Sequence, residues 1–389
     1  MTKVLYKNCT LIDGRGEEPL VSSILVEDGK ILALGQDLDY DELVDLEGKF
    51  VMPGLINSHV HITMEPVGNP YVYLLNEPDS RTSLRGARNL MKHLRAGTTY
   101  FRDLGAAHGI DIELRKAVED GLVEGAEFKC AGSVVTMTGG HGWPIGREAD
   151  GPYETRKAAR EQLKAGADLI KIMATGGVMT SGVEPGSPQL SLEEMKAAVE
   201  EAHKAGRKTA SHAQGTQGIK NAILAGIDSI EHGIILDDEA IDMMIERGTF
   251  LVPTLVAPYW IIKNGVEAGI KQDAYDKSKS VMDIHLNSFK EAYKKGVKIA
   301  MGTDAGTPFN LHSMDWMELK LMIDAGMTPM DAIVASTRNS AELLDILDMY
   351  GTLEEGKFAD FLVLDENPLE NIETLGQIRA VYKKGRLVI

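Results

Sequence analysis

The feature that most constrains the fold is an alternation of short apolar runs and longer amphipathic segments through the middle of the chain. Apolar runs of about four to eight residues bounded by glycine or polar residues are typical of buried parallel strands, and the amphipathic segments have a helical period. Eight strands alternating with helices predict an α/β protein with a (β/α)8 TIM-like barrel. The eight runs are GLINSHVH, TTYFRDLG, FKCAGSVVT, LIKIMATGG, KTASHAQG, SIEHG, FLVPTLVA and KIAMGTDAG.

Two of the amphipathic segments begin with recognisable start signals. Ser191 followed by Glu194 has the spacing of a capping box, in which each side chain bonds the other residue's backbone. Thr328 precedes Pro329, and proline favours the first position of a helix. Both signals predict helices that begin directly after them.

The two ends of the chain have a different texture from the middle. Residues 1–56 and 348–389 consist of short apolar runs joined by turns, and Asp28-Gly29 and Lys384-Gly385 are hairpin signals. Strand-like segments at both ends predict that the termini meet in one small β-sandwich. The barrel is then expected to span residues 57–347.

The charge and the cysteine content exclude several classes of protein. A net charge of −17 argues against nucleic acid and anionic membranes as partners, because both favour basic patches. Cys9 and Cys130 are too few for a disulfide framework. The N-terminal residues carry charges where a signal peptide needs an apolar core, and no apolar run approaches about 18 residues. We therefore expect a cytoplasmic protein.

Histidine, lysine and aspartate residues lie in or at the ends of five of the eight predicted strands. In a barrel of this type, the C-terminal ends of the strands face the active site, so residues far apart in sequence converge there. The residues are His59 and His61 in the first run, Lys171 in the fourth, His212 in the fifth, His232 in the sixth and Asp304 in the eighth.

Imidazole and carboxylate ligands suit zinc and related divalent ions. Each residue alone has an ordinary alternative: Lys171 could be a strand-end lysine that reaches solvent, and Asp304 could cap a helix. Their joint placement on one rim favours a metal site. Because an ammonium repels a cation, Lys171 fits such a site if carbon dioxide has added to its amine to give a carbamate.

The same motifs resemble those of the amidohydrolase superfamily. The resemblance covers essentially the whole chain and implies a barrel flanked by a terminal β-domain. It is most specific for the branch that contains imidazolonepropionase-like enzymes, Xaa-Pro dipeptidase-like prolidases and carboxypeptidases. It also implies a small-molecule or dipeptide substrate and a chain that can form a homo-oligomer. The motifs are PGLINSHVH, TGGHG, IKIMATGG, IEHG, GTDAGTP and GKFADFLVLDENPL.

The resemblance further implies a binuclear site with zinc as the first expectation and manganese, cobalt or iron as alternatives. A hydroxide shared by two cations attacks the carbonyl, and Asp304 is the implied catalytic acid and base. The implied ligands are His59, His61 and Asp304 for the more buried ion, His212 and His232 for the second, and N6-carboxylated Lys171 as the bridge.

The predicted reaction is hydrolysis of a small amide, such as a dipeptide with C-terminal proline or an N-acyl amino acid. An aryl-amide, carbamate or urea hydrolase would share the same metal site. A heterocycle deaminase is the less favoured alternative, because such members lack the lysine and place a glutamate about three residues after the His212 position; here Gly215 stands there. A non-enzymatic barrel would tend to lose the ligands.

Three further residues are candidates for substrate binding. His141 follows the third run in a glycine-rich loop that allows the backbone to approach a ligand, although it could make only a structural hydrogen bond. Arg147 could pair with a carboxylate or remain an exposed loop residue. Tyr259, into which the seventh run leads, could wall an apolar pocket or pack beneath the β-domain.

Overall fold

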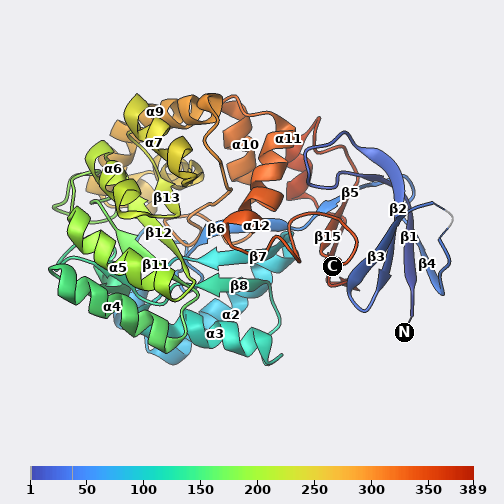
Figure 1. The fold of residues 1–389 in the computed structure, drawn as a ribbon, viewed down its shortest axis with the longest axis horizontal. Coiled ribbons are helices and arrows are strands. Elements are labelled where there is room, and N and C mark those ends of the chain that lie inside the picture. Colours follow the sequence, from blue (N-terminus) through green and yellow to red (C-terminus); the bar gives the residue numbers. More distant parts are fainter. Residues whose placement is uncertain (1, 37) are drawn as a thin grey trace.

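The computed structural model describes residues 2–36 and 38–389 and has two parts (Figure 1). A ring of strands and helices forms one part, and a sheet built from both ends of the chain forms the other. Both labelled termini lie in this sheet (Figure 1). The mixed α/β architecture predicted from the sequence is therefore confirmed.

The terminal sheet has eight strands in the order β17-β16-β15-β5-β1-β2-β3, with β4 paired to β1. The hairpins β2–β3 and β16–β17 turn at Asp28-Gly29 and Lys384-Gly385, and all four residues have the positive φ that such turns require. The strands are β1 (Val4–Leu11), β2 (Leu20–Glu27), β3 (Lys30–Gly35), β4 (Glu42–Asp45), β5 (Phe50–Pro53), β15 (Phe361–Leu364), β16 (Ala380–Lys383) and β17 (Arg386–Leu387).

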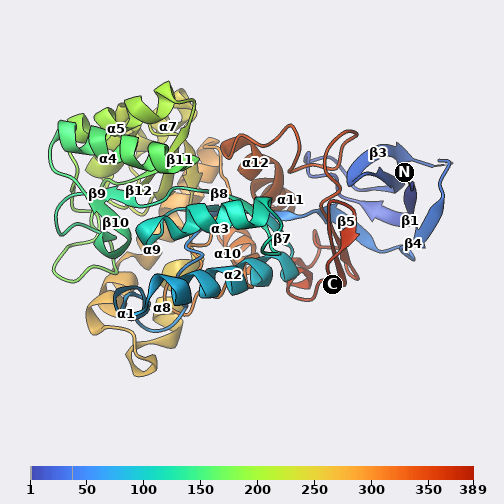
Figure 2. The ribbon, with the colours of Figure 1, turned by 90° about the horizontal axis from the view of Figure 1, so that it is seen from below.

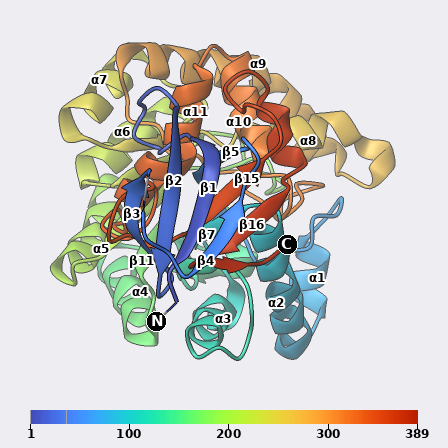
Figure 3. The same ribbon diagram turned by 90° about the vertical axis from the view of Figure 1, so that its right-hand side faces the viewer.

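This sheet has an apolar core of its own. The rings of Tyr6, Phe361 and Tyr382 pack with centroids 4.5–5.1 Å apart, and they come from β1, β15 and β16. Residues from both ends of the chain therefore share one core. Seen from its own side, the sheet lies in front of the helices of the ring (Figure 3).

The ring is built from parallel strands. β6 pairs with β7 and β7 with β8, while β9, which continues the path of β8, pairs with β11. The series runs on through β12, β13 and β14, and bridges from Leu251 to Ile299 and from Ala305 to Val60 close it. The strands are β6 (Leu55–Val60), β7 (Thr98–Asp103), β8 (Glu127–Cys130), β9 (Val134–Thr136), β10 (Gly146–Glu148), β11 (Leu169–Met173), β12 (Lys208–Ala213), β13 (Ser229–His232) and β14 (Phe250–Val252).

Helices cover the outside of the ring, and Figure 2 shows α2 and α3 side by side along one flank. The predicted capping box of Ser191 and Glu194 begins α5, and Thr328 caps α11 with Pro329 at its first turn. The helices are α1 (Tyr71–Asn76), α2 (Asp79–Arg95), α3 (Ile110–Glu119), α4 (Pro152–Ala165), α5 (Leu192–Lys204), α6 (Thr216–Ala225), α7 (Asp238–Arg247), α8 (Val256–Asn264), α9 (Gln272–Lys295), α10 (Trp316–Asp324), α11 (Pro329–Val334) and α12 (Ser340–Leu343).

One detail of the predicted seventh strand is wrong. β14 ends at Val252, and Tyr259 lies inside α8 rather than at a strand end. The two backbone N–H groups at the start of α8, those of Leu255 and Val256, donate to the buried carboxylate of Glu318, which stabilises a helix start there. Among the described residues, no helix is long and apolar enough to cross a membrane.

Candidate metal centre

The structure brings the six predicted ligands together. All of them line one cavity at the C-terminal ends of the barrel strands. The strands position them because five of the predicted ligands lie at or just past the end of a buried apolar run, while Lys171 lies in the middle of β11. The predicted ligands are His59 on β6, His61 directly after this strand, Lys171 on β11, His212 on β12, His232 on β13 and Asp304 in the segment that closes the ring.

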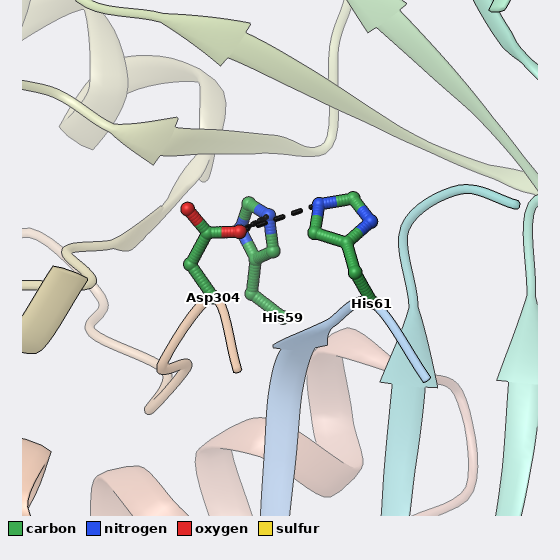
Figure 4. A group of neighbouring side chains, drawn as sticks. All are labelled: His59, His61 and Asp304. Atoms are coloured by element: carbon green, nitrogen blue, oxygen red, sulfur yellow. Dashed lines mark ion pairs between the residues drawn. The ribbon is translucent and has the colours of Figure 1, made fainter. Parts of the chain in front are cut away.

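Asp304 faces the first two histidines directly (Figure 4). Its Oδ1 atom is 3.3 Å from Nε2 of His59 and 3.3 Å from Nε2 of His61. One potential donor atom from each of the three residues lies within 4.8 Å of the others. Burial opposes the charge of Asp304, yet the two imidazoles hold the pKa of its carboxyl well below its usual value. This group offers three convergent donor atoms.

The other two histidines lie beside this group. The ring of His232 is 5.2 Å from that of His59 and 4.6 Å from that of His212, measured between centroids. His232 Nδ1 bonds Thr254 Oγ1 at 2.6 Å, which leaves Nε2 free. His212 Nε2 lies 3.2 Å from the carbonyl oxygen of Gly176, which leaves Nδ1 free. Burial lowers the pKa of both rings, so both are neutral and can act as ligands.

Lys171 is the unusual member of the cluster. Its side chain is 1% exposed, and none of the ion pairs in the described part of the chain involves it. Burial lowers the pKa of its amine to about 8, so a larger fraction of the amine is uncharged near neutral pH than in an exposed lysine. An uncharged amine is the form that can add carbon dioxide.

A buried ion pair between Glu231 and Arg102 fixes the orientation of the His59 ring. His59 Nδ1 lies 2.9 Å from Glu231 Oε2, and Glu231 Oε1 lies 2.8 Å from the guanidinium of Arg102. The pairing leaves Nε2 of His59 directed at Asp304. The sequence interpretation missed this pair, although two opposite charges within buried strand runs, TTYFRD and SIEH, could have indicated it.

The backbone is strained at two of the ligands. His232 and Asp304 have φ angles of 73° and 60°, in the left-handed region that residues with a side chain rarely adopt. Such strain persists only where the surrounding structure enforces it, and it is common at functional sites. Both residues turn sharply at the ends of their strands, and this turns their side chains into the cavity.

This donor set fits a divalent metal. Buried neutral imidazoles and a carboxylate whose free lone pairs converge are the chemistry that zinc and its neighbours prefer. The other ring nitrogens of three ligands are held by Glu231, Thr254 and Gly176, which is the outer arrangement that orients metal-binding histidines.

The three predicted substrate-binding residues have different positions. His141 lines the cavity, its ring 4.2 Å from that of His212, and burial lowers its pKa to about 4. Arg147 instead pairs with Glu154 and Glu161, outside the lining of the cavity. Tyr259 hydrogen-bonds Lys263 on the same helix and does not line the cavity either. The structure thus brings only His141 to the site.

Two apolar compartments adjoin the cluster. One is the part of the cluster's own cavity that is walled by Met64, Tyr71 and Met173; Tyr71 and Met179 also line an outer cavity of about 260 Å³. The other lies against α8 and α9 and contains His212, His232 and Asp304 in its lining. A substrate that reaches the cluster can therefore extend an apolar group to either side.

A closed barrel with histidine and carboxylate donors at its strand ends defines the class of barrel hydrolases that bind metal at this rim. The chain belongs to the amidohydrolase family, whose model matches residues 50–388. As a member of this family, it is a hydrolase that acts on the C–N bonds of amides.

Individual relatives cover nearly the whole chain. Ochratoxinase from Aspergillus niger is 34% identical in an alignment of 418 positions, which covers 97% of this chain and 85% of that protein. A crystal structure of a Xaa-Pro dipeptidase with bound methionine in the active site is 34% identical, covers 99% of both chains and has a TM-score of 0.91. A prolidase complexed with N-methylphosphonate-L-proline is 29% identical, with 100% and 99% coverage and a TM-score of 0.92.

Proposed function

We propose that this protein is a binuclear metal-dependent amidohydrolase that cleaves a small amide, with a dipeptide, Xaa-Pro included, or an N-acyl amino acid as the first substrates to consider. One observation carries the proposal. Lys171 is buried and forms no ion pair within the described residues, in a cavity that also contains five histidines and Asp304. Burying an isolated ammonium is costly, whereas a carbamate between two cations is stabilised.

Two divalent ions, when bound, make water nucleophilic near neutral pH and polarise the scissile carbonyl. Zinc suits the donor set, and manganese, cobalt and iron also accept it. The residues that would hold the ions are His59, His61 and Asp304 for one, His212 and His232 for the other, and N6-carboxylated Lys171 between them.

Asp304 is the residue for proton transfer in this proposal. Its low pKa keeps the carboxylate ionised, so it can accept a proton from the attacking water. It lines both apolar compartments, so it can then deliver that proton to the nitrogen that leaves. The neutral ring of His141 also lines both compartments and is the candidate to orient the substrate carbonyl.

The similarity to a Xaa-Pro dipeptidase and to a prolidase supports a dipeptide as the first substrate class. A second candidate is a neutral aryl amide, carbamate or urea. The lining of the two compartments favours this candidate. Among the described residues that form this lining, Lys171 is the only lysine, and none is an arginine. Within these two compartments, a substrate carboxylate therefore has no arginine and no second lysine as a partner.

The test uses the purified protein loaded with zinc or manganese and a panel of dipeptides, N-acyl amino acids, aryl amides and aminated heterocycles. Free amino acid and ammonia are measured in parallel, and bound metal is measured by mass spectrometry. We expect amino acid without ammonia and about two ions per chain. Ammonia without amino acid, or full activity of His59→Ala, would overturn the proposal.

A further inference from the structure

The inner compartment beside α8 and α9 contains two polar atoms that the fold leaves without partners. Oε1 of Gln214 and Nδ1 of His285 are both buried, and neither has a hydrogen-bond partner within the described residues. Both side chains line this compartment, and they are 4% and 1% exposed. Buried polar groups are nearly always paired in native proteins, so two orphans in one pocket indicate a ligand.

The fold fixes the backbone of Gln214 and the ring of His285. The backbone N–H of Gln214 donates to Thr175 Oγ1 at 3.0 Å, and its carbonyl accepts from Ile235 N at 2.8 Å. The ring of His285, on α9, has Nε2 only 2.9 Å from the carbonyl oxygen of His232, to which it donates. In the neutral ring, Nδ1 is then an acceptor. Two residues that line the compartment thus each carry a buried acceptor atom without a partner.

The remaining wall of the compartment is aliphatic. Ile234, Ile261 and Val281 are at most 6% exposed and come from the loop after β13, from α8 and from α9, while Ala257 and Pro258 complete the side formed by α8. A group that fills this space gains stability by burying apolar surface. It must also donate hydrogen bonds, because otherwise both acceptors stay unpaired.

We propose that this compartment binds the aminoacyl half of the substrate, with the α-amino group donating to Gln214 and His285 and an aliphatic side chain lying against Ile234, Ile261 and Val281. The inference rests on the proposed amide hydrolysis and adds the direction in which the substrate binds. The N-terminal half of a dipeptide lies in the inner compartment, and the C-terminal half extends toward the outer cavity past Tyr71.

The test compares Leu-Pro with 4-methylpentanoyl-proline, which differs only in having hydrogen in place of the amino group. We expect wild-type kcat/KM to be roughly 10- to 100-fold higher for Leu-Pro, because the analogue leaves both acceptors unpaired. Gln214→Leu and His285→Phe should each reduce this ratio, mainly by slowing Leu-Pro. Gln217→Leu, at an exposed glutamine three residues away, is the matched control and should keep the ratio.

Equal hydrolysis of the two substrates, or an unchanged ratio in both variants, would overturn the inference and leave the amidohydrolase proposal intact. If neither substrate is cleaved, binding gives an answer that does not need turnover. Leucinamide should then raise the melting temperature of the metal-loaded protein more than 4-methylpentanamide does, and Gln214→Leu should remove the difference. Equal shifts for the two amides would overturn the inference by this route as well.

Discussion

The two ends of the barrel strands use charged residues in opposite ways. At the C-terminal ends, Lys171 is buried without an ion-pair partner, and His232 and Asp304 have strained backbones. At the N-terminal end of β8, Glu127 is paired with Lys383 at 2.7 Å and Lys384 at 2.6 Å and accepts a hydrogen bond from Tyr350. One end leaves polar groups available for a ligand, whereas the other satisfies them and ties the barrel to the terminal sheet.

The strongest test of this contrast is Asp304→Asn. We expect kcat/KM to fall by a factor of about a thousand or more, because the amide cannot transfer the proton. The melting temperature should stay close to that of the wild type, since asparagine tolerates a positive φ. The exposed Asp345 also has a positive φ, so Asp345→Asn is the matched control and should retain activity. Substantial turnover by Asp304→Asn would refute its catalytic role.

Glu231→Gln separates support of the metal from support of the fold. The affinity for zinc, measured by competition with a chelator, should fall about 10- to 100-fold, because His59 loses the carboxylate that orients it. The same change leaves the buried guanidinium of Arg102 without its ion-pair partner and should destabilise the protein by about 3–5 kcal/mol.

Adding Arg102→Met to Glu231→Gln provides the control. Removing the unpaired guanidinium of Arg102 should recover part of the free energy of unfolding, measured by denaturant titration, without restoring the metal affinity. Recovery of both quantities together would show that Glu231 acts on the fold alone.

His141→Asn and Arg147→Ala test where the site ends. We expect the first change to lower kcat/KM by about 10- to 100-fold, because a group that borders both compartments is altered. The second should leave it within about twofold, since Arg147 is occupied by Glu154 and Glu161 and lies outside the lining. A large loss for Arg147→Ala would mean that these ion pairs open when substrate binds.

Glu127→Gln should leave kcat/KM unchanged and lower the free energy of unfolding by about 1–3 kcal/mol. Burial opposes the charge of Glu127, but Lys383 and Lys384 lower its pKa to about 2 in the folded state, against about 4.3 in the unfolded chain. Its stabilisation is therefore present above that unfolded value and is lost as the pH falls toward 2. Unfolding measured between pH 5 and 2 should show a smaller pH dependence in Glu127→Gln than in the wild type.

The sequence predicted the ligand candidates more completely than their surroundings. His59, His61 and Asp304 each end an apolar run, so their position on the rim follows from strand periodicity and barrel geometry. Gln214 also follows a strand run, two residues after His212, but nothing in the sequence shows that its Oε1 atom lacks a partner. His285 lies within the long helix α9, and only its packing against the carbonyl of His232 shows that it borders the site. Arg147 shows the converse, since its loop suggested a substrate contact and its ion pairs hold it elsewhere.

The sequence by itself determined the barrel, the sheet shared by both termini and the set of donor residues, because periodicity, turn chemistry and strand-end placement are local properties of the chain. The tertiary structure alone decided which atoms of these residues are free. The pairing of Glu231 with both His59 and Arg102, the solitary burial of Lys171 and the two unpartnered acceptors at Gln214 and His285 each depend on side chains that are distant in sequence and meet only when the ring closes.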